Sequence, residues 1–389
     1  MREAPLSQKT RSFQRDIARA ESDKPVPMDR TAQDRGKLTV DPRKLYQTIS
    51  KTSRLPVILG SKLARLTNQR FLQIRLDTNN TCNLRCKMCY FSLDSIREQP
   101  KHFMTVEQFS DLGAKLFPLC RRLYLSCKTE PLLSKHFGEF LQIAANSGVP
   151  FISFITNGTA LNEKNINAIV ASNVTQVIVS IDGYKKATVE GIRIGLHFEQ
   201  WIARIKQLST AIKANPDCKT KLRFNMVVMK SNIEEVLGVL DLAFECGVNE
   251  LQLRALHSRD AYDYEYKQHI EMDMSDENTG IEGKLLALKP ALMEKIRGKE
   301  FTVLFPVSPD GVALKCSYPW FNHYIDSTGN FYPCAYLPAV GKISEVDSYS
   351  ELMEKAAPVM QEVQRGLRKE CKECEQLGRL YSDSELLNA

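Results

Sequence analysis

The sequence predicts an α/β fold in which parallel strands are joined by helices, and three observations support this prediction. The chain has 389 residues, 43% of them hydrophobic, so it can bury a full-sized core. Between residues 71 and 256, six apolar runs alternate with helical patterns. Most of these runs end in small or polar residues, where a strand gives way to a loop. Because each crossover must return the chain to the same end of the sheet, we expect a partial or full α/β barrel, with a doubly wound sheet as the alternative.

The elements follow in chain order. Residues 1–36 are polar and without sustained periodicity, which predicts a mobile arm, and residues 37–70 predict a helical lead-in. Residues 71–257 form the predicted barrel, 258–300 a charged linker with a helix near 283–297, and 301–389 a small cysteine-rich domain. Strands are expected over residues 71–79, 121–127, 150–158, 175–182, 221–230 and 250–256, with helices from Thr105 and Asn162 and over 136–148, 198–212 and 232–247.

Charge and hydropathy exclude several classes of partner. The formal net charge of +7 comes from 53 basic and 46 acidic residues mixed along the chain, without the basic stripe expected of a nucleic-acid-binding protein. No run approaches the 18 or so apolar residues that span a bilayer, and the N-terminus lacks the apolar segment of a signal peptide. We therefore expect a cytoplasmic protein with neither a nucleic-acid nor a membrane partner.

Three of the eleven cysteines, Cys82, Cys86 and Cys89, lie in one short loop after the first strand. In a reducing compartment such clustering favours metal ligation over disulfides. A cubane iron–sulfur cluster is commonly held by four cysteines, so three thiolates would leave one iron free to bind a small molecule. The alternatives are a zinc site that borrows a fourth ligand such as His102, or a set of packed core thiols.

The pattern CxxxCxxC, with Met88 before the last cysteine, resembles the radical S-adenosylmethionine (SAM) superfamily over roughly residues 70–256. The resemblance implies a partial (β/α)6 TIM-like barrel and a [4Fe-4S] cluster on Cys82, Cys86 and Cys89, whose open iron binds the amino and carboxylate groups of SAM. One electron from such a cluster cleaves SAM to a 5'-deoxyadenosyl radical, which abstracts hydrogen from a substrate C–H. Met88 is accordingly expected to contact the cofactor.

A second motif of the family, which follows its second strand, is matched in part by this chain. Where the family has Gly-Gly-Glu-Pro, whose glutamate receives the SAM amino group, this chain has Lys128-Thr129-Glu130-Pro131. Glu130 and Pro131 fit, but the glycines that allow a close backbone approach are replaced. The alternative for Glu130 is a solvated loop carboxylate.

Four further residues resemble family contacts to SAM. Ser180 and Asp182 share one face of the fourth strand and match the segment that reaches the ribose and carboxylate. Arg193 resembles an arginine that pairs with the SAM carboxylate, where a guanidinium offers two hydrogen bonds. Asn157 follows the third strand and is expected at the edge of the site. The alternative for each is a turn former or a surface charge.

Four cysteines near the C-terminus, Cys316, Cys334, Cys371 and Cys374, could close round a second metal centre. Cys316 and Cys334 bracket a predicted hairpin turn at residues 328–330, and zinc is the alternative to iron and sulfur. The run from Gly329 to Cys334 resembles the C-terminal SPASM or shorter "twitch" extension of radical SAM enzymes. Four cysteines match the one-cluster twitch version, which implies an auxiliary [4Fe-4S] cluster able to conduct an electron.

The leading functional prediction is a radical SAM oxidoreductase that abstracts hydrogen from a substrate and uses the auxiliary cluster as electron acceptor or conduit. One alternative is a radical epimerase of a peptide or carbohydrate, in which Cys127 donates a hydrogen atom. The alternative for Cys127, a buried packing thiol, is favoured over this role. Another is a non-catalytic iron–sulfur or zinc scaffold. The resemblance implies flavodoxin or ferredoxin as electron donor. The substrate could be a small molecule, a carbohydrate or a peptide, and residues 1–70 lack the pattern of a leader-peptide-binding domain.

Overall fold

Six parallel strands are neighbours in the central sheet in the same order as in the chain. The computed structural model describes residues 55–255, 278–305, 316–371 and 385–388. Because the strand order runs on without reversal, the predicted partial (β/α)6 barrel is confirmed and a doubly wound sheet is excluded. The six strands are β1 (Leu72–Leu76), β3 (Cys120–Tyr124), β4 (Phe151–Thr156), β5 (Gln176–Ile181), β7 (Lys221–Val228) and β8 (Glu250–Ala255).

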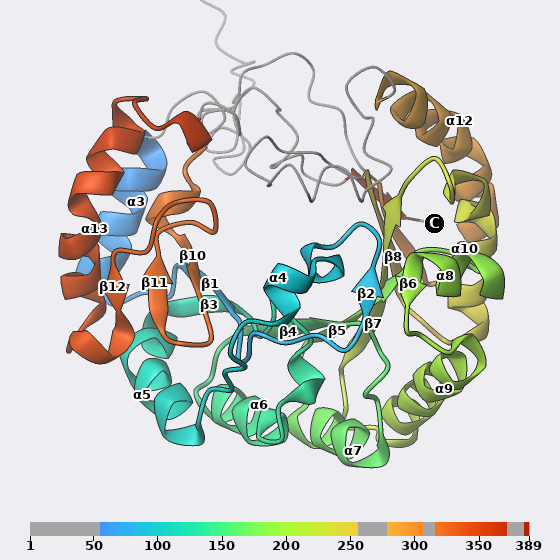
Figure 1. The fold of residues 1–389 in the computed structure, drawn as a ribbon, viewed down its shortest axis with the longest axis horizontal. Coiled ribbons are helices and arrows are strands. Elements are labelled where there is room, and N and C mark those ends of the chain that lie inside the picture. The colour runs from blue at the N-terminus through green and yellow to red at the C-terminus, as the bar shows by residue number, and fades with distance from the viewer. Residues whose placement is uncertain (1–54, 256–277, 306–315, 372–384, 389) are drawn as a thin grey trace, which may run out of the picture. The chain divides into compact units, whose positions relative to one another are not determined.

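Helices cover the outer face of this sheet (Figure 1). Their boundaries follow local chemistry. Thr105 and Gln108 form a capping box at the start of α5, and Asn173 ends α7 in the left-handed conformation. The helices are α5 (Val106–Leu116), α6 (Phe137–Asn146), α7 (Glu163–Ser172), α8 (Lys186–Ile192), α9 (Phe198–Ala214), α10 (Val236–Glu245) and α12 (Asn278–Ile296).

The two faces of the sheet differ in chemistry. Residues that point toward the helices are apolar and fully buried, for example Leu72, Ile74 and Leu76 on β1. Gln73 and Arg75 alternate with them on the inner face and are only partly buried. A closed barrel would fill this inner space with apolar side chains, whereas here it is lined with polar groups.

Strands from the last ninety residues extend the sheet at both ends. β9 (Thr302–Phe305) pairs parallel to β8, and β10 (Asn322–Ile325) pairs parallel to β1. β11 (Asn330–Tyr332) turns back on β10, which confirms the predicted hairpin, and β12 (Gly341–Lys342) follows it. β13 (Glu385–Asn388) pairs antiparallel to β9. The edges β12 and β13 are not paired with one another, so the sheet is open.

The connection between β8 and β9 goes beyond the sequence prediction. The helix expected near residues 283–297 is α12, but it leads directly into β9 beside β8 and so continues the strand–helix alternation past residue 300. Of the helical lead-in predicted for residues 37–70, α3 (Leu55–Leu66) is observed. Residues 37–54 and the predicted arm 1–36 lie outside the described residues.

A second, smaller apolar core is built from α3 and from residues between 320 and 363. It combines Val57 of α3, Trp320 of the 3-10 helix η5 (Tyr318–Trp320) and Met360 of α13 (Tyr349–Gln364). Cys334 is buried in this core and Cys371 packs against it. No helix in the part of the chain that the structure describes is long and apolar enough to cross a membrane.

Candidate active site

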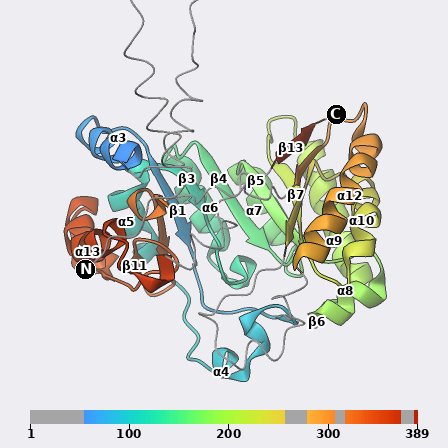
Figure 2. The same ribbon diagram turned by 90° about the horizontal axis from the view of Figure 1, so that it is seen from above.

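The cysteine loop lies beyond the carboxyl ends of the parallel strands. It leaves β1, forms β2 (Arg85–Cys86) and continues through the 3-10 helix η1 (Tyr90–Ser92) into α4 (Asp94–Arg97). β2 pairs antiparallel with β6 (Arg193–Ile194), which places Cys86 opposite Arg193. Figure 2 shows α4 and β6 together past one end of the strands. A site at this edge is expected for parallel α/β folds.

The three thiols of the loop are near enough to influence one another. The pKa of Cys86 is raised to about 12, chiefly by burial and also by the charges of Cys89 and Cys82, while Arg193 opposes the rise. Burial likewise raises the pKa of Cys89 to about 11. Metal ligation requires thiolates, so loading this loop must release protons. Among the described residues, no three His, Cys, Asp or Glu side chains are arranged to hold a single metal ion.

Arg193 is the positive charge closest to these thiols. One guanidinium nitrogen forms an ion pair with the Asp182 carboxylate at 2.6 Å, and another lies 3.9 Å from the Cys86 sulfur. Both side chains of the pair are buried, at 6% and 0% exposure. The Nε–H of Arg193 is buried and has no hydrogen-bond partner. Arg193 and Asp182 therefore lie beside the cysteine loop, and their burial rules out the surface-charge alternative, while their predicted contacts with SAM stay a prediction.

Glu130 links three parts of the site. Its Oε1 accepts hydrogen bonds from the Leu132 amide at 3.1 Å and the Thr156 hydroxyl at 2.7 Å, and its Oε2 accepts one from the Asn157 amide at 2.6 Å. Its backbone amide donates to the Thr81 carbonyl, one residue before Cys82. The residue is 1% exposed, so the alternative of a solvated loop carboxylate is wrong.

Glu130 accepts fewer hydrogen bonds from the described residues than a carboxylate can. Burial raises the pKa of Glu130 to about 7, although its three hydrogen bonds oppose the rise. A carboxylate can accept about four hydrogen bonds, and Glu130 accepts three from the protein. The remaining acceptor position is on Oε2. Pro131 follows in the buried 3-10 helix η3 (Pro131–Leu133), which fixes the turn after Glu130.

Asn157 lies at the edge of the cysteine loop. Its side-chain amide lies 3.7 Å from the Cys82 sulfur and donates to Asn83 Oδ1 at 2.9 Å. Its Oδ1 accepts from the amide and hydroxyl of Thr159, so the turn-forming role is also present. Asn157 thus connects the end of β4 with the first cysteine.

Asp77 is a site residue that was not predicted from the sequence. It directly follows β1 and is 1% exposed. Its Oδ1 accepts from the amides of Cys127 and Lys128 and the hydroxyl of Thr129, and its Oδ2 accepts from the Tyr324 hydroxyl at 2.9 Å. Burial raises its pKa. An acidic residue after a buried strand was the available sign, but its partners are distant in sequence.

Met88 and Ser180 lie apart from this polar network. Met88 lines a recess of about 190 Å³ with Ile192 and Met229, next to the cysteine loop. Ser180 is half-buried at the end of β5 and pairs in register with Asn225 of β7. Both therefore lie at the predicted edge of the sheet.

Cys127 lies at the end of β3 on the Asp77 side of the site. Its backbone amide donates to Asp77 at 2.7 Å, and the residue is half-buried. The pKa of its thiol is raised to about 11, chiefly by burial and also by the charge of Asp77, while Arg75 and Lys128 oppose the rise. The thiol is therefore protonated at neutral pH.

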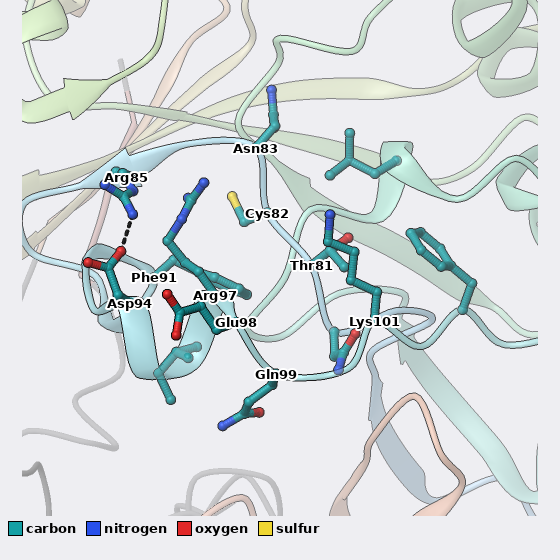
Figure 3. A pocket seen from close by; sticks show the side chains of 14 residues that line it. Thr81, Cys82, Asn83, Arg85, Phe91, Asp94, Arg97, Glu98, Gln99 and Lys101 are labelled. Carbon is teal, nitrogen blue, oxygen red and sulfur yellow. Dashed lines mark hydrogen bonds and ion pairs between the residues drawn. The ribbon is translucent and has the colours of Figure 1, made fainter.

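One side of the cysteine loop is open to solvent. A recess of about 670 Å³ exposes the Cys82 side of the loop and is lined by residues of the loop and of α4 (Figure 3). Its charges are mixed, and Arg85 and Asp94 form an ion pair within it. The other charged residues of its lining are Arg97, Glu98 and Lys101.

Three of the four C-terminal cysteines lie within the described residues. Cys316 and Cys334 are buried and Cys371 is half-buried. Cys334 and Cys371 belong to the same apolar core. Cys374 lies outside the described residues, so the predicted four-cysteine set stays a prediction.

The residues present fit a SAM-binding cluster by their chemistry. Three thiols share one loop, a buried guanidinium beside them has an unused donor, and a buried carboxylate has an unused acceptor position. An unsatisfied buried donor costs about 1–3 kcal/mol, which binding of an anionic group would offset. The unused donor and acceptor suit a carboxylate and an amine respectively.

Comparisons with known proteins agree with this arrangement. The model of the Radical SAM superfamily matches residues 77–243. A GTP 3',8-cyclase from Synechocystis sp. is 23% identical over 190 residues, 49% of this chain and 55% of that protein. An AdoMet-dependent heme synthase from Methanosarcina barkeri is 24% identical over 289 residues, 71% of this chain and 80% of that protein. The match to the cyclase spans only about half of its length.

Solved structures show the same fold. Streptococcus suis SuiB bound to precursor peptide SuiA is 12% identical, with a TM-score of 0.61 over 95% of this chain and 82% of that chain. The structure of anSMEcpe with bound AdoMet is 16% identical, with a TM-score of 0.53 over 81% of this chain and 89% of that chain. At these identities the likeness concerns the fold alone.

Proposed function

Because the chain carries a domain of the radical SAM superfamily, we propose that it reductively cleaves SAM and uses the resulting 5'-deoxyadenosyl radical to abstract hydrogen from a substrate C–H. The observation that supports this most is the convergence of the CxxxCxxC loop with Arg193, Asp182 and Glu130 at the carboxyl edge of the sheet. Bound to Cys82, Cys86 and Cys89, a [4Fe-4S] cluster would supply the electron that breaks the sulfonium bond.

The surrounding residues would bind and orient SAM. Arg193 offers its unused Nε–H to the SAM carboxylate, and Glu130 offers the free acceptor position of Oε2 to the SAM amino group. Met88 and Met229 line an apolar recess beside the loop, which suits a flat aromatic base. Ser180 is half-buried near the end of β5, at the carboxyl edge of the sheet where the ribose would bind.

The overall reaction that we propose is an oxidation of the substrate. One electron from a flavodoxin or ferredoxin and one SAM give methionine and the radical, which becomes 5'-deoxyadenosine by taking a hydrogen atom from the substrate. The substrate radical then loses one electron and one proton. Cys316, Cys334, Cys371 and Cys374 would hold the auxiliary [4Fe-4S] cluster that accepts this electron. The recess at Cys82 offers the electron donor an approach to the first cluster.

The test is anaerobic reconstitution, with iron and sulfide content, electron paramagnetic resonance with and without SAM, and detection of 5'-deoxyadenosine. We expect about eight irons per chain from two four-iron clusters and a signal that changes when SAM is added. The Cys82/Cys86/Cys89→Ala variant should keep about four irons, those of the auxiliary cluster, and lose the SAM-sensitive signal.

The matched control is Cys218→Ala/Cys246→Ala, because both are buried cysteines far from the loop in sequence. This variant should keep both clusters and the SAM response. A wild-type protein that takes up iron but forms no 5'-deoxyadenosine under reduction would contradict the proposed function. If the C-terminal cysteines bound zinc in place of an iron–sulfur cluster, the proposed auxiliary electron acceptor would be absent.

Epimerisation is the second candidate, and the state of Cys127 favours it. A hydrogen atom can be donated by a thiol but not by a thiolate, and burial keeps the Cys127 thiol protonated. The donor would become a thiyl radical that needs one electron and one proton to be restored, which the auxiliary cluster and solvent could supply. In D₂O an epimerase should place deuterium on the product carbon, and Cys127→Ala should abolish that incorporation while 5'-deoxyadenosine still forms.

A further inference from the structure

Two arginines on the inner face of the sheet have no acidic partner among the residues that the structure describes. Arg75 lies on β1 and Arg254 on β8, at opposite sides of the central strands β4 and β5 (Figure 1). Each is next in sequence to a buried residue that faces the helices, Ile74 on β1 and Leu253 on β8. Within the described residues, neither guanidinium forms an ion pair with a carboxylate.

A third inner-face arginine shows the contrast. Arg223 of β7 contacts the Glu250 carboxylate through two nitrogens, at 2.7 and 2.6 Å, and Gln176 donates to the same carboxylate oxygen at 2.8 Å. Its charge is therefore compensated by the protein. Among the described residues, no carboxylate compensates the charges of Arg75 and Arg254 in this way, and withdrawing an unpaired charge from water is unfavourable.

Asp77, two residues after Arg75, directs its carboxylate to other partners. Asp77 has both carboxylate oxygens occupied, by the 127–129 loop and by Tyr324. Arg75 instead stacks over the Tyr124 ring at 5.3 Å, and Lys128 lies 4.5 Å over the Tyr324 ring. These contacts hold the cations in place and add positive charge to the same region.

Arg75 and Arg254 face a common space. Burial lowers the pKa of Arg254, and the like charge of Arg75 lowers it further. Both arginines also interact electrostatically with Cys127 and Tyr318. By its accessible surface Arg254 is an exposed residue.

Three buried polar atoms on the same inner face lack hydrogen-bond partners in the described part of the chain. They are Ser153 Oγ on β4, Asn225 Oδ1 on β7 and Asn322 Oδ1 on β10. The residues are 0%, 9% and 4% exposed. Their strand neighbours Phe154, Phe224 and His323 contact aromatic residues of the outer helices, so these three side chains point inward. Buried polar groups are normally paired, and their distribution over three strands indicates a polar ligand.

We propose that the inner face of the sheet binds an anionic substrate, with Arg75 and Arg254 holding its carboxylate or phosphate groups and Ser153, Asn225 and Asn322 contacting its polar remainder. This inference rests on the proposed function, because it names the substrate class of the same enzyme. Cys127 lies beside Arg75, so a substrate held in this way would also reach the carboxyl edge of the sheet where the cysteine loop lies.

The test measures anion binding without SAM turnover. Isothermal titration calorimetry on the anaerobically reconstituted full-length protein would use inorganic phosphate and succinate as probes, with sodium chloride at matched ionic strength. We expect saturable binding of at least one probe, weakened about tenfold or more in Arg75→Gln and in Arg254→Gln, because a charge-assisted hydrogen bond is lost in each. Preference for phosphate over succinate would identify a phosphate-bearing substrate, and the reverse a carboxylate.

Arg121→Gln is the control, because Arg121 is an exposed arginine at the start of β3 and its loss changes the net charge equally. It should bind the probes like the wild type. Arg254→Gln changes an exposed side chain and is therefore expected to fold. It can test the inference even if Arg75→Gln folds poorly. Unchanged binding in Arg254→Gln, or no saturable binding by the wild type, overturns the inference. A wild type that binds the probes but forms no 5'-deoxyadenosine contradicts only the proposed function.

Discussion

Arg193 combines several contacts in one buried side chain. It pairs with Asp182, lies beside the Cys86 sulfur and keeps a free Nε–H. A buried guanidinium is stable only where its charge is compensated, and Asp182 with the cysteine thiolates would provide that compensation. Removing it would leave Asp182 as an uncompensated buried charge.

We therefore expect Arg193→Gln to lower the free energy of unfolding by about 3–5 kcal/mol and to weaken SAM binding. The double variant Asp182→Asn/Arg193→Gln should recover part of the stability, because it removes the unpaired carboxylate, but none of the SAM affinity. Denaturant unfolding and SAM titration measure the two effects separately. Arg297→Gln, which breaks an exposed ion pair with Glu294, should change stability by less than about 0.5 kcal/mol. Equal losses in Arg297→Gln and Arg193→Gln would refute this account.

Glu130 accepts hydrogen bonds where glutamine would offer a donor. In Glu130→Gln an amide NH₂ must face either the Asn157 amide or the Leu132 amide and Thr156 hydroxyl. We expect a loss of about 1–3 kcal/mol in unfolding free energy from the unsatisfied groups. Glu139→Gln changes an exposed carboxylate of α6 and is the control for the change in charge. A Glu130→Gln protein as stable as the control would show that these hydrogen bonds contribute little.

At the scale of elements, the hydrophobic periodicity of the sequence was sufficient to predict the six barrel strands and the helices between them. The six barrel strands carry apolar residues on the face that the helices cover, and this pattern is visible in the sequence. The cysteine spacing similarly located the loop that β2 and β6 hold. The position of Glu130 was predicted, but its buried hydrogen bonds to Thr156 and Asn157 were not.

What sequence reasoning missed depends on contacts between distant segments. β9 and β10 have four residues each, too few to show a period, and they are strands because β8 and β1 offer free edges. Asp77 depends on Tyr324, nearly 250 residues later. The unpartnered atoms of Ser153 and Asn225 become informative only when the two strands are placed on one face.

His323 makes the packing of β10 against α13 sensitive to pH. It is buried, with Nδ1 near the Pro333 carbonyl at 3.1 Å and Nε2 near the Tyr349 hydroxyl at 2.9 Å. Burial lowers its pKa from 6.5 to about 4. At a pH between about 4 and 6.5, His323 is protonated in the unfolded chain but neutral in the folded protein. The free energy of unfolding therefore falls as the pH is lowered below 6.5.

We expect the wild type to lose about 2 kcal/mol more than His323→Gln when the pH is lowered from 7.5 to 5. Glutamine can keep both hydrogen bonds but does not titrate, so other acid-sensitive groups cancel in the comparison. Denaturant unfolding of both proteins at the two pH values provides the measurement. Parallel losses in both proteins would mean that His323 does not take up a proton in this range.

At the scale of the whole molecule, one sheet joins segments from both ends of the described chain. β10 covers the edge of β1 and β9 covers the edge of β8, so the last ninety residues close both sides of the six-stranded core. The Tyr324 hydroxyl also reaches Asp77 at the carboxyl edge, beside the loop that contains Cys127. The barrel and the cysteine-rich segment therefore share hydrogen bonds as well as a surface.

A chain that ends after Arg297 should consequently fail to fold as a soluble barrel. It would expose the backbone edges of β1 and β8 and would uncover apolar residues such as Leu72 and Leu251, which are 0% exposed in the full chain. We expect it to aggregate on expression, whereas Tyr324→Phe, which loses only the bond to Asp77, should stay soluble with both clusters. Size-exclusion chromatography and iron content of the two proteins decide the matter. A soluble truncated chain with four irons and a SAM-sensitive signal would instead make residues 71–297 an independent domain, to which the C-terminal segment is only attached.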